Sequence, residues 1–110
     1  MKAMLLDDIA PIGASPLAFR EVADPEPGAG KVRLRVRYCA ICRTDLHVIE
    51  GDLPRVKLPV VPGHQIVGVV DRLGTGCTRW QLGERVGAAW LRHTCGGCRF
   101  CLSWREQSYP

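Results

Sequence analysis

The chain has 110 residues, the length of one domain with a single hydrophobic core, and a second domain of full size does not fit within them. Hydrophobic residues make up 46% and charged residues 24%, a composition that excludes a disordered or low-complexity chain. The net charge is +4. In segment 31–38, however, basic and apolar residues alternate, which favours a strand with a solvated charged face over a nucleic-acid surface.

The sequence contains no run that approaches the ~18 apolar residues of a membrane span. The apolar run at the start is also too short for a secretory signal before Asp7 and Asp8. We therefore expect a cytoplasmic protein without a membrane partner. In that reducing compartment, the six cysteines indicate metal or redox chemistry before disulfides.

Short alternating segments dominate the predicted secondary structure. We expect strands over residues 4–6, 17–22, 32–38, 66–73 and 85–91, and turns over 25–30 and 74–76. The exception is 42–50, where Leu46 and Ile49 share one helical face and Gly51 is a suitable C-cap. The sequence thus predicts a mainly β fold with one short helix.

Three cysteines, Cys95, Cys98 and Cys101, have C-x-x-C-x-x-C spacing, which is typical of a metal-binding loop. An iron–sulfur run of the ferredoxin type would have a fourth cysteine and a proline where this chain has Arg105 and Glu106. Three free thiols in a loop remain the alternative.

A second candidate metal centre combines Cys42 with His64, a thiolate and an imidazole that suit zinc and leave further coordination positions open. Asp45 could accept the other ring N–H of His64 and so fix its tautomer. Taken alone, His64 is equally well explained as a histidine in a turn.

These residues resemble a known family. Cys42-Arg43-Thr44-Asp45 with His47, then Gly63-His64, then the triplet that begins at Cys95 are similar to the N-terminal catalytic domain of the medium-chain zinc-dependent alcohol dehydrogenases. The resemblance implies a GroES-like, partly open β-barrel over residues 1–110, with a structural-zinc-type loop over about 93–110. The family's Rossmann domain has no counterpart in these residues.

The resemblance also implies roles for individual residues. Cys42 and His64 are ligands of a catalytic zinc, and Thr44 hydrogen-bonds the substrate alcohol. The proton of the alcohol then passes through the cofactor ribose to His47 and so to solvent. Arg43 contacts the pyrophosphate of NAD(P), although a surface arginine explains it equally well. The implied cofactors are zinc and NAD(P), the implied partner is a small alcohol or aldehyde, and oligomerisation is possible. Apolar residues that line the family's alcohol pocket, or simply pack in the core, are Leu53, Trp90 and Leu91.

Three positions depart from the family pattern. Tyr109 stands where a fourth structural-zinc cysteine is usual, Trp104 where a small residue is usual, and Gln65 where a glutamate often follows the ligand histidine. A third catalytic-zinc ligand and the nucleotide-binding half also have no counterpart here. A truncated or frameshifted sequence would explain these departures, and we expect no turnover from these 110 residues alone.

Two other functions compete with this one. The cysteine triplet could define a small zinc-binding module with a structural or partner-binding role. Cys39 and Cys42 could instead form a redox pair, although we favour a buried thiol for Cys39. We expect Cys77 to be structural and His93 to lie on the surface, with a substitute metal ligand as the alternative role for His93.

Overall fold

The computed structural model describes residues 1–54, 56–91 and 93–108. The elements in chain order are β1 (Lys2–Leu6), the 3-10 helix η1 (Ile12–Ala14), β2 (Leu17–Glu21), β3 (Val32–Ala40), α1 (Arg43–Glu50), β4 (Gln65–Leu73), β5 (Arg85–Ala88), α2 (Arg99–Leu102) and the 3-10 helix η2 (Glu106–Ser108). The expected mainly β fold is confirmed, and its single expected helix corresponds to α1. Sequence reasoning did not anticipate the short helical turns η1, α2 and η2.

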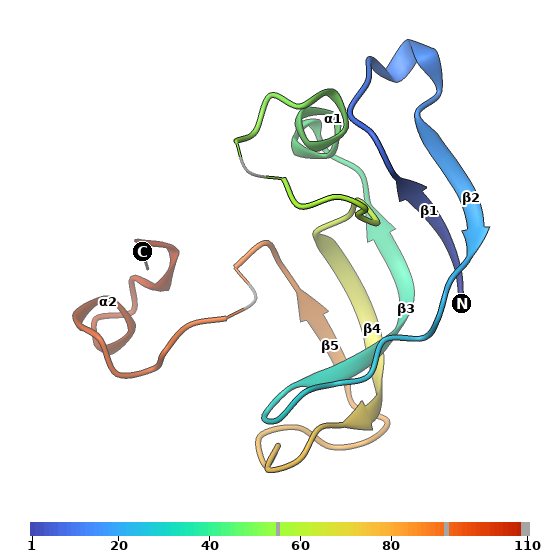
Figure 1. Ribbon diagram of the computed structural model, residues 1–110. Coiled ribbons are helices and arrows are strands. Elements are labelled where there is room, and N and C mark those ends of the chain that lie inside the picture. Colours follow the sequence, from blue (N-terminus) through green and yellow to red (C-terminus); the bar gives the residue numbers. More distant parts are fainter. Residues whose placement is uncertain (55, 92, 109–110) are drawn as a thin grey trace.

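The strands form two small antiparallel sheets, visible side by side in Figure 1. One pairs β1 with β2, and the other has the order β3-β4-β5. These strands do not close into a barrel within the described residues. β5 ends at Ala88 rather than at residue 91, because Ala88 pairs with Ile66 near the first residue of β4 and little of that strand remains to pair with.

The long strand β3 is irregular, and none of its residues is fully buried. Its register against β4 shifts between Arg33 and Leu34 and again between Val36 and Tyr38. Each shift interrupts the regular alternation of side chains between the two faces of a sheet. In addition, β3 is exposed on both faces from Arg35 to Ala40. Cys39 is therefore exposed, and the expectation that it is a buried thiol was wrong.

The small core of the described residues includes Leu6 of β1, Ile49 of α1 and Val70 of β4. Leu6 is fully buried and exchanges two backbone hydrogen bonds with Val60, so the segment before His64 is held against β1. Ile49 is also buried, and its carbonyl accepts a hydrogen bond from the Ala10 amide. Asp45 and Ile49 are one helical turn apart and lie on the same buried face of α1. This packing positions the start of α1 beside the loop that leads into β4.

The segment that follows β5 projects away from both sheets and carries α2 near its end (Figure 1). The expected turn after β4 is present, since the Cys77 amide donates to the Gly74 carbonyl, but the connection continues to residue 84 before β5 begins. Among the described residues, no helix has both the length and the apolar character needed to cross a membrane.

Candidate functional site

The first candidate centre is built at the N-terminus of α1, where Cys42 is the N-cap residue. Its Sγ accepts a hydrogen bond from the Thr44 amide at 3.3 Å, and its own amide donates to Oδ2 of Asp45 at 2.8 Å. This reciprocal arrangement is a capping box, which satisfies backbone donors that the first turn of a helix leaves unpaired. The local sequence thus fixes Cys42 and Asp45 relative to each other.

His64 reaches this helix end from the other side. Its Nδ1 donates to Oδ1 of Asp45 at 3.0 Å, and its Nε2 lies 3.2 Å from Sγ of Cys42. Asp45 is only 6% exposed, and both of its oxygens accept hydrogen bonds. Because Nδ1 carries the donated hydrogen, a neutral His64 presents a lone pair on Nε2 toward the cysteine sulfur.

This geometry fits a zinc ion held by Cys42 and His64. Tetrahedral bonds of about 2.3 Å to sulfur and about 2.0 Å to nitrogen place those two ligand atoms about 3.5 Å apart, close to the 3.2 Å between Sγ and Nε2. Asp45 lies within the same group, but it holds the imidazole rather than offering a free ligand oxygen. Its predicted role as the hydrogen-bond partner of His64 agrees with this geometry.

Two further candidates lie on α1. Thr44 and His47 are three residues apart, so they occupy neighbouring positions on one side of the helix. Nδ1 of His47 lies 2.7 Å from Oδ2 of Asp52, just beyond the helix. Asp52 was missed by sequence reasoning, although its place directly after a C-cap glycine was a signal available in the sequence. Arg43, the first residue of α1, is exposed.

The three proposed pocket residues have different surroundings in the structure. Trp90 approaches His64 edge-on, with ring centroids 5.2 Å apart, and so lies beside the first centre. Leu91 instead borders a hollow of about 410 Å³ together with Arg79 and His93. Leu53 is half-buried in the segment after α1.

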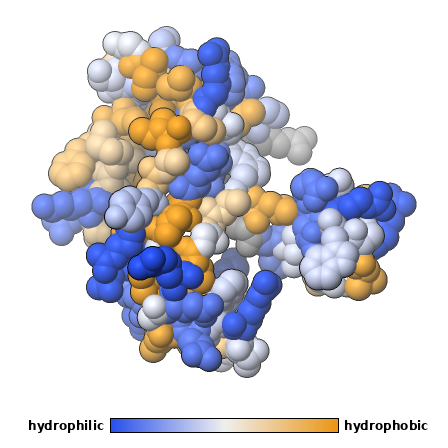
Figure 2. Space-filling model, turned by 180° about the vertical axis from the view of Figure 1, so that it is seen from behind, coloured by the Kyte–Doolittle hydropathy of each residue, from blue (hydrophilic) through white to orange (hydrophobic). Residues whose placement is uncertain are grey.

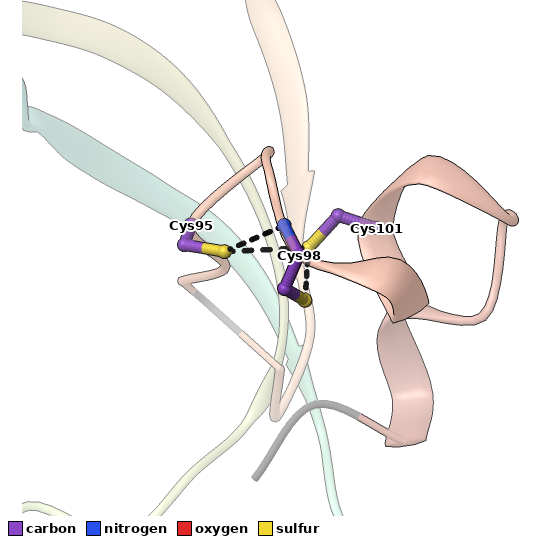
Figure 3. A group of neighbouring side chains, drawn as sticks. All are labelled: Cys95, Cys98 and Cys101. Carbon is purple, nitrogen blue, oxygen red and sulfur yellow. Dashed lines mark hydrogen bonds between the residues drawn. The ribbon is translucent and has the colours of Figure 1, made fainter.

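The second candidate centre is the cysteine triplet, which Figure 3 shows with its three sulfur atoms directed toward one another. Sγ of Cys101 lies 3.9 Å from that of Cys95 and 3.5 Å from that of Cys98. A tetrahedral zinc–thiolate site with bonds of about 2.3 Å has sulfur atoms about 3.8 Å apart, so these distances also fit zinc. Gly96 has a φ of 70°, a left-handed conformation that lets the loop turn between the first two ligands.

Backbone donors prepare one of these thiols for metal binding. Hydrogen bonds from the amides of Gly97 and Cys98 lower the pKa of Cys95 to about 7, with the Cys98 amide 3.3 Å from its sulfur. Burial raises the pKa of Cys101, and its contact with Cys98 raises it further. Cys95 is therefore the thiol that most readily provides a thiolate in this loop.

The departures from the family pattern differ in their structural consequences. Trp104 has a φ of 58° and is 87% exposed, so a bulky side chain occupies a left-handed position that suits glycine. Tyr109, the proposed replacement for a fourth cysteine, lies outside the described residues. Cys77 is half-buried, and His93 is exposed as expected.

The contacts of the cysteines also bear on the redox alternative. The Cys39 thiol donates only a long hydrogen bond of 3.7 Å to the Ala40 carbonyl. Cys42 directs its sulfur toward His64 and the Thr44 amide instead. The described contacts thus give the two cysteines separate partners.

Comparison with known proteins connects this geometry to a family. The model of the alcohol dehydrogenase GroES-like domain matches residues 28–109. An alcohol dehydrogenase of Geobacillus stearothermophilus is 42% identical over 107 residues, which cover 96% of this chain and 31% of that protein.

Solved structures agree with the sequence match. A cobalt- and zinc-bound thermostable alcohol dehydrogenase from Pyrobaculum aerophilum superposes with a TM-score of 0.87 at 31% identity, covering 99% of this chain and 32% of its own. A structure described as an NAD-dependent alcohol dehydrogenase gives 0.83 at 29% identity, covering 100% of this chain and 32% of its own. The chain therefore spans about a third of the length of these relatives. It belongs to the alcohol dehydrogenase GroES-like domain family.

Proposed function

We propose that residues 1–110 form the GroES-like catalytic domain, or a portion of it, of a zinc-dependent alcohol dehydrogenase that interconverts alcohols with aldehydes or ketones. The observation that carries this proposal is the Cys42–His64–Asp45 arrangement, with 3.2 Å between Sγ and Nε2 and 3.0 Å between Nδ1 and the carboxylate. The relatives are alcohol dehydrogenases, of which one is NAD-dependent and another binds cobalt and zinc. The proposed cofactors are accordingly zinc and NAD(P).

Cys42 and His64 would hold the catalytic zinc, and the cysteine triplet would hold a structural one. When bound, zinc would acidify the alcohol hydroxyl and NAD(P) would accept the hydride. The chain's own residues prepare this chemistry. Asp45 keeps His64 in the tautomer whose Nε2 can coordinate, and the amide of Thr44 donates to the Cys42 sulfur and helps to orient it.

The proton would leave along α1. Thr44 would hydrogen-bond the substrate hydroxyl and take up its proton. With the ribose of a bound cofactor between the two side chains, His47 would be the later acceptor that releases the proton to solvent. The side chain of His47 is 36% exposed, so solvent can reach it. Arg43, exposed at the start of the same helix, is available for the proposed contact with the pyrophosphate.

The first test is a native mass spectrum of the protein isolated from its own source, which reports the chain length and the bound zinc together. Serine substitution of Cys42 and alanine substitution of His64 should remove one zinc, and Cys98→Ser should remove a different one. Cys77→Ser is the matched control, because this half-buried thiol belongs to neither cysteine centre. An unchanged zinc content after substitution of Cys42 and of His64 would contradict the proposal.

The second test measures alcohol-dependent NADH or NADPH formation by that isolated protein. Thr44→Ala should lower kcat by about a hundredfold, because it removes the first acceptor of the proton relay. An unchanged kcat would exclude Thr44 from the relay. The matches to alcohol dehydrogenases over most of the chain do not favour the alternative of a small zinc-binding module.

A further inference from the structure

At the end of α1 the chain folds back, so that an aspartate after the helix contacts a histidine within it. The helix ends at Glu50, and Gly51 adopts a left-handed φ of 84°. The amides of Gly51 and Asp52 both donate to the His47 carbonyl, at 3.1 and 3.0 Å. Because these two bonds fold the chain back over the last turn, the Asp52 carboxylate reaches Nδ1 of His47 at 2.7 Å.

This contact determines which nitrogen of a neutral imidazole carries the hydrogen. A carboxylate accepts hydrogen bonds but donates none, so Nδ1 must be the protonated nitrogen when it contacts Asp52. Nε2 then has no hydrogen and can accept a proton. His64 is held in the same way, since Asp45 accepts its Nδ1 hydrogen and its Nε2 faces Cys42.

We infer that Asp52 is a positioning residue that holds neutral His47 in the Nδ1–H tautomer and so presents Nε2 as the acceptor of the proton relay. The proton relay in this inference rests on the proposed function, whereas the tautomer of His47 can be measured without catalysis. Other acidic groups of α1 are engaged elsewhere: Asp45 accepts from His64, and Glu50 accepts from the Ile12 amide.

The pair is also suited to a clean substitution. The side chains of His47 and Asp52 are 36% and 58% exposed, and exposed ion pairs contribute little to overall stability. Removal of the Asp52 carboxylate should therefore change the state of the imidazole without unfolding the chain.

The experiment is long-range proton–nitrogen correlation NMR on the 15N-labelled 110-residue chain, at a pH where all three histidines are neutral. Substitution of His47 by asparagine assigns its signals. We expect the wild-type His47 to be the Nδ1–H tautomer. Asp52→Ala should shift it mainly to the Nε2–H tautomer, the form that free histidine prefers in water. Asp8→Ala, at an exposed aspartate, is the matched control and should change nothing.

An Nε2–H tautomer in the wild type, or an unchanged tautomer in Asp52→Ala, would overturn the inference. If Asp52→Ala does not give a folded spectrum, Asp52→Asn replaces it. Its carboxamide can donate to Nδ1 as well as accept from it, so the Nδ1–H population should fall in that variant as well. The signals of His64 provide an internal reference, because Asp45 is unchanged.

Failure of the proposed function gives a different result. If Asp52→Ala changes the tautomer but His47→Gln leaves alcohol oxidation by the protein unchanged, the positioning contact stands and the relay is wrong. If the tautomer does not respond to Asp52, the inference fails whatever the catalytic result.

Discussion

At the scale of single residues, Asp45 connects the two parts of the first centre. One oxygen caps α1 through the Cys42 amide, and the other holds the His64 ring. A single carboxylate thus stabilises the helix start and selects the nitrogen that faces the cysteine. The same residue contributes to folding and to the proposed chemistry, so its substitution should affect stability as well as metal binding.

Asp45→Ala should lower the free energy of unfolding by roughly 2 kcal/mol, because it removes a buried charged acceptor from the Cys42 amide and from the His64 imidazole. Urea unfolding followed by circular dichroism measures the change. Asp8→Ala, at an exposed position, should have a much smaller effect. If Asp45→Ala lowered the free energy of unfolding as little as Asp8→Ala does, the hydrogen bonds of Asp45 would not contribute to stability.

The thiols of the second centre should differ in reactivity. In metal-free protein, alkylation of Cys95 by iodoacetamide should increase with pH and reach half its maximum near pH 7, ahead of Cys101, whose pKa is raised. Peptide mass spectrometry after timed labelling measures both rates. Faster labelling of Cys101 than of Cys95 at pH 7 would contradict the backbone hydrogen bonding seen in the loop.

The direction of the stability effect follows from the same shift. The folded-state pKa of Cys95 is below its ordinary value of 9.0, so its ionisation stabilises the folded loop. This contribution is fully present above pH 9 and is lost as the pH falls through about 7. Zinc, which binds thiolates, should therefore be released as the solution is acidified.

At the scale of elements, an unfavourable residue follows α2, the short helix that contains Cys101. Trp104 occupies a left-handed position with φ of 58°, which costs an ordinary residue about 1 kcal/mol or more. Its side chain is exposed, so its removal should cost little stability. Glycine adopts this conformation freely, as Gly96 does in the same loop.

Trp104→Gly should therefore raise stability by about 0.5 kcal/mol, the difference between the relieved strain and the greater freedom of glycine in the unfolded chain. Leu102→Gly is the control, because Leu102 is also exposed but belongs to α2, where glycine should destabilise by about 1 kcal/mol. Thermal unfolding of the zinc-loaded chain compares the two. Destabilisation by both variants would mean that the Trp104 side chain has stabilising contacts.

At the scale of the whole molecule, little hydrophobic surface is buried. The buried hydrophobic residues recorded for the described chain are Ala3, Leu6, Ile49 and Val70. Many large apolar side chains are open to solvent, including Tyr38 at 76% and Ile41 at 87% exposure. Figure 2 shows hydrophobic residues lying open on the main body of the molecule. Such a surface is typical of a region that packs against further protein.

The 110-residue chain should consequently bind the dye 1-anilinonaphthalene-8-sulfonate under native conditions. The joint substitution of Tyr38 and Ile41 by serine should reduce the fluorescence, because both side chains offer exposed apolar surface. Exposed charged positions such as Asp8 give the control variant Asp8→Ser. Native fluorescence no higher than that of a fully covered globular protein would contradict this prediction.

Sequence spacing alone could predict the local parts of both centres. The capped helix and the C-x-x-C-x-x-C loop bring together residues within a few positions of each other, where backbone geometry limits the possible arrangements. The mainly β fold was also predictable, because alternation of apolar and polar residues is a local pattern. Cys42, His64 and the cysteine triplet were named as ligands from such patterns and from their resemblance to a family.

The tertiary structure decided the contacts between distant segments. The Leu6–Val60 pairing and the core beneath α1 bring His64 to Cys42 across 22 residues, and no local rule specifies that approach. The second half of β3 is uncovered on both faces, which leaves Cys39 exposed. After β5, Trp90 lies against His64, whereas Leu91 borders a separate hollow. The physical reason is the same throughout: spacing determines which groups a short segment can offer, whereas packing and strand register determine which groups meet.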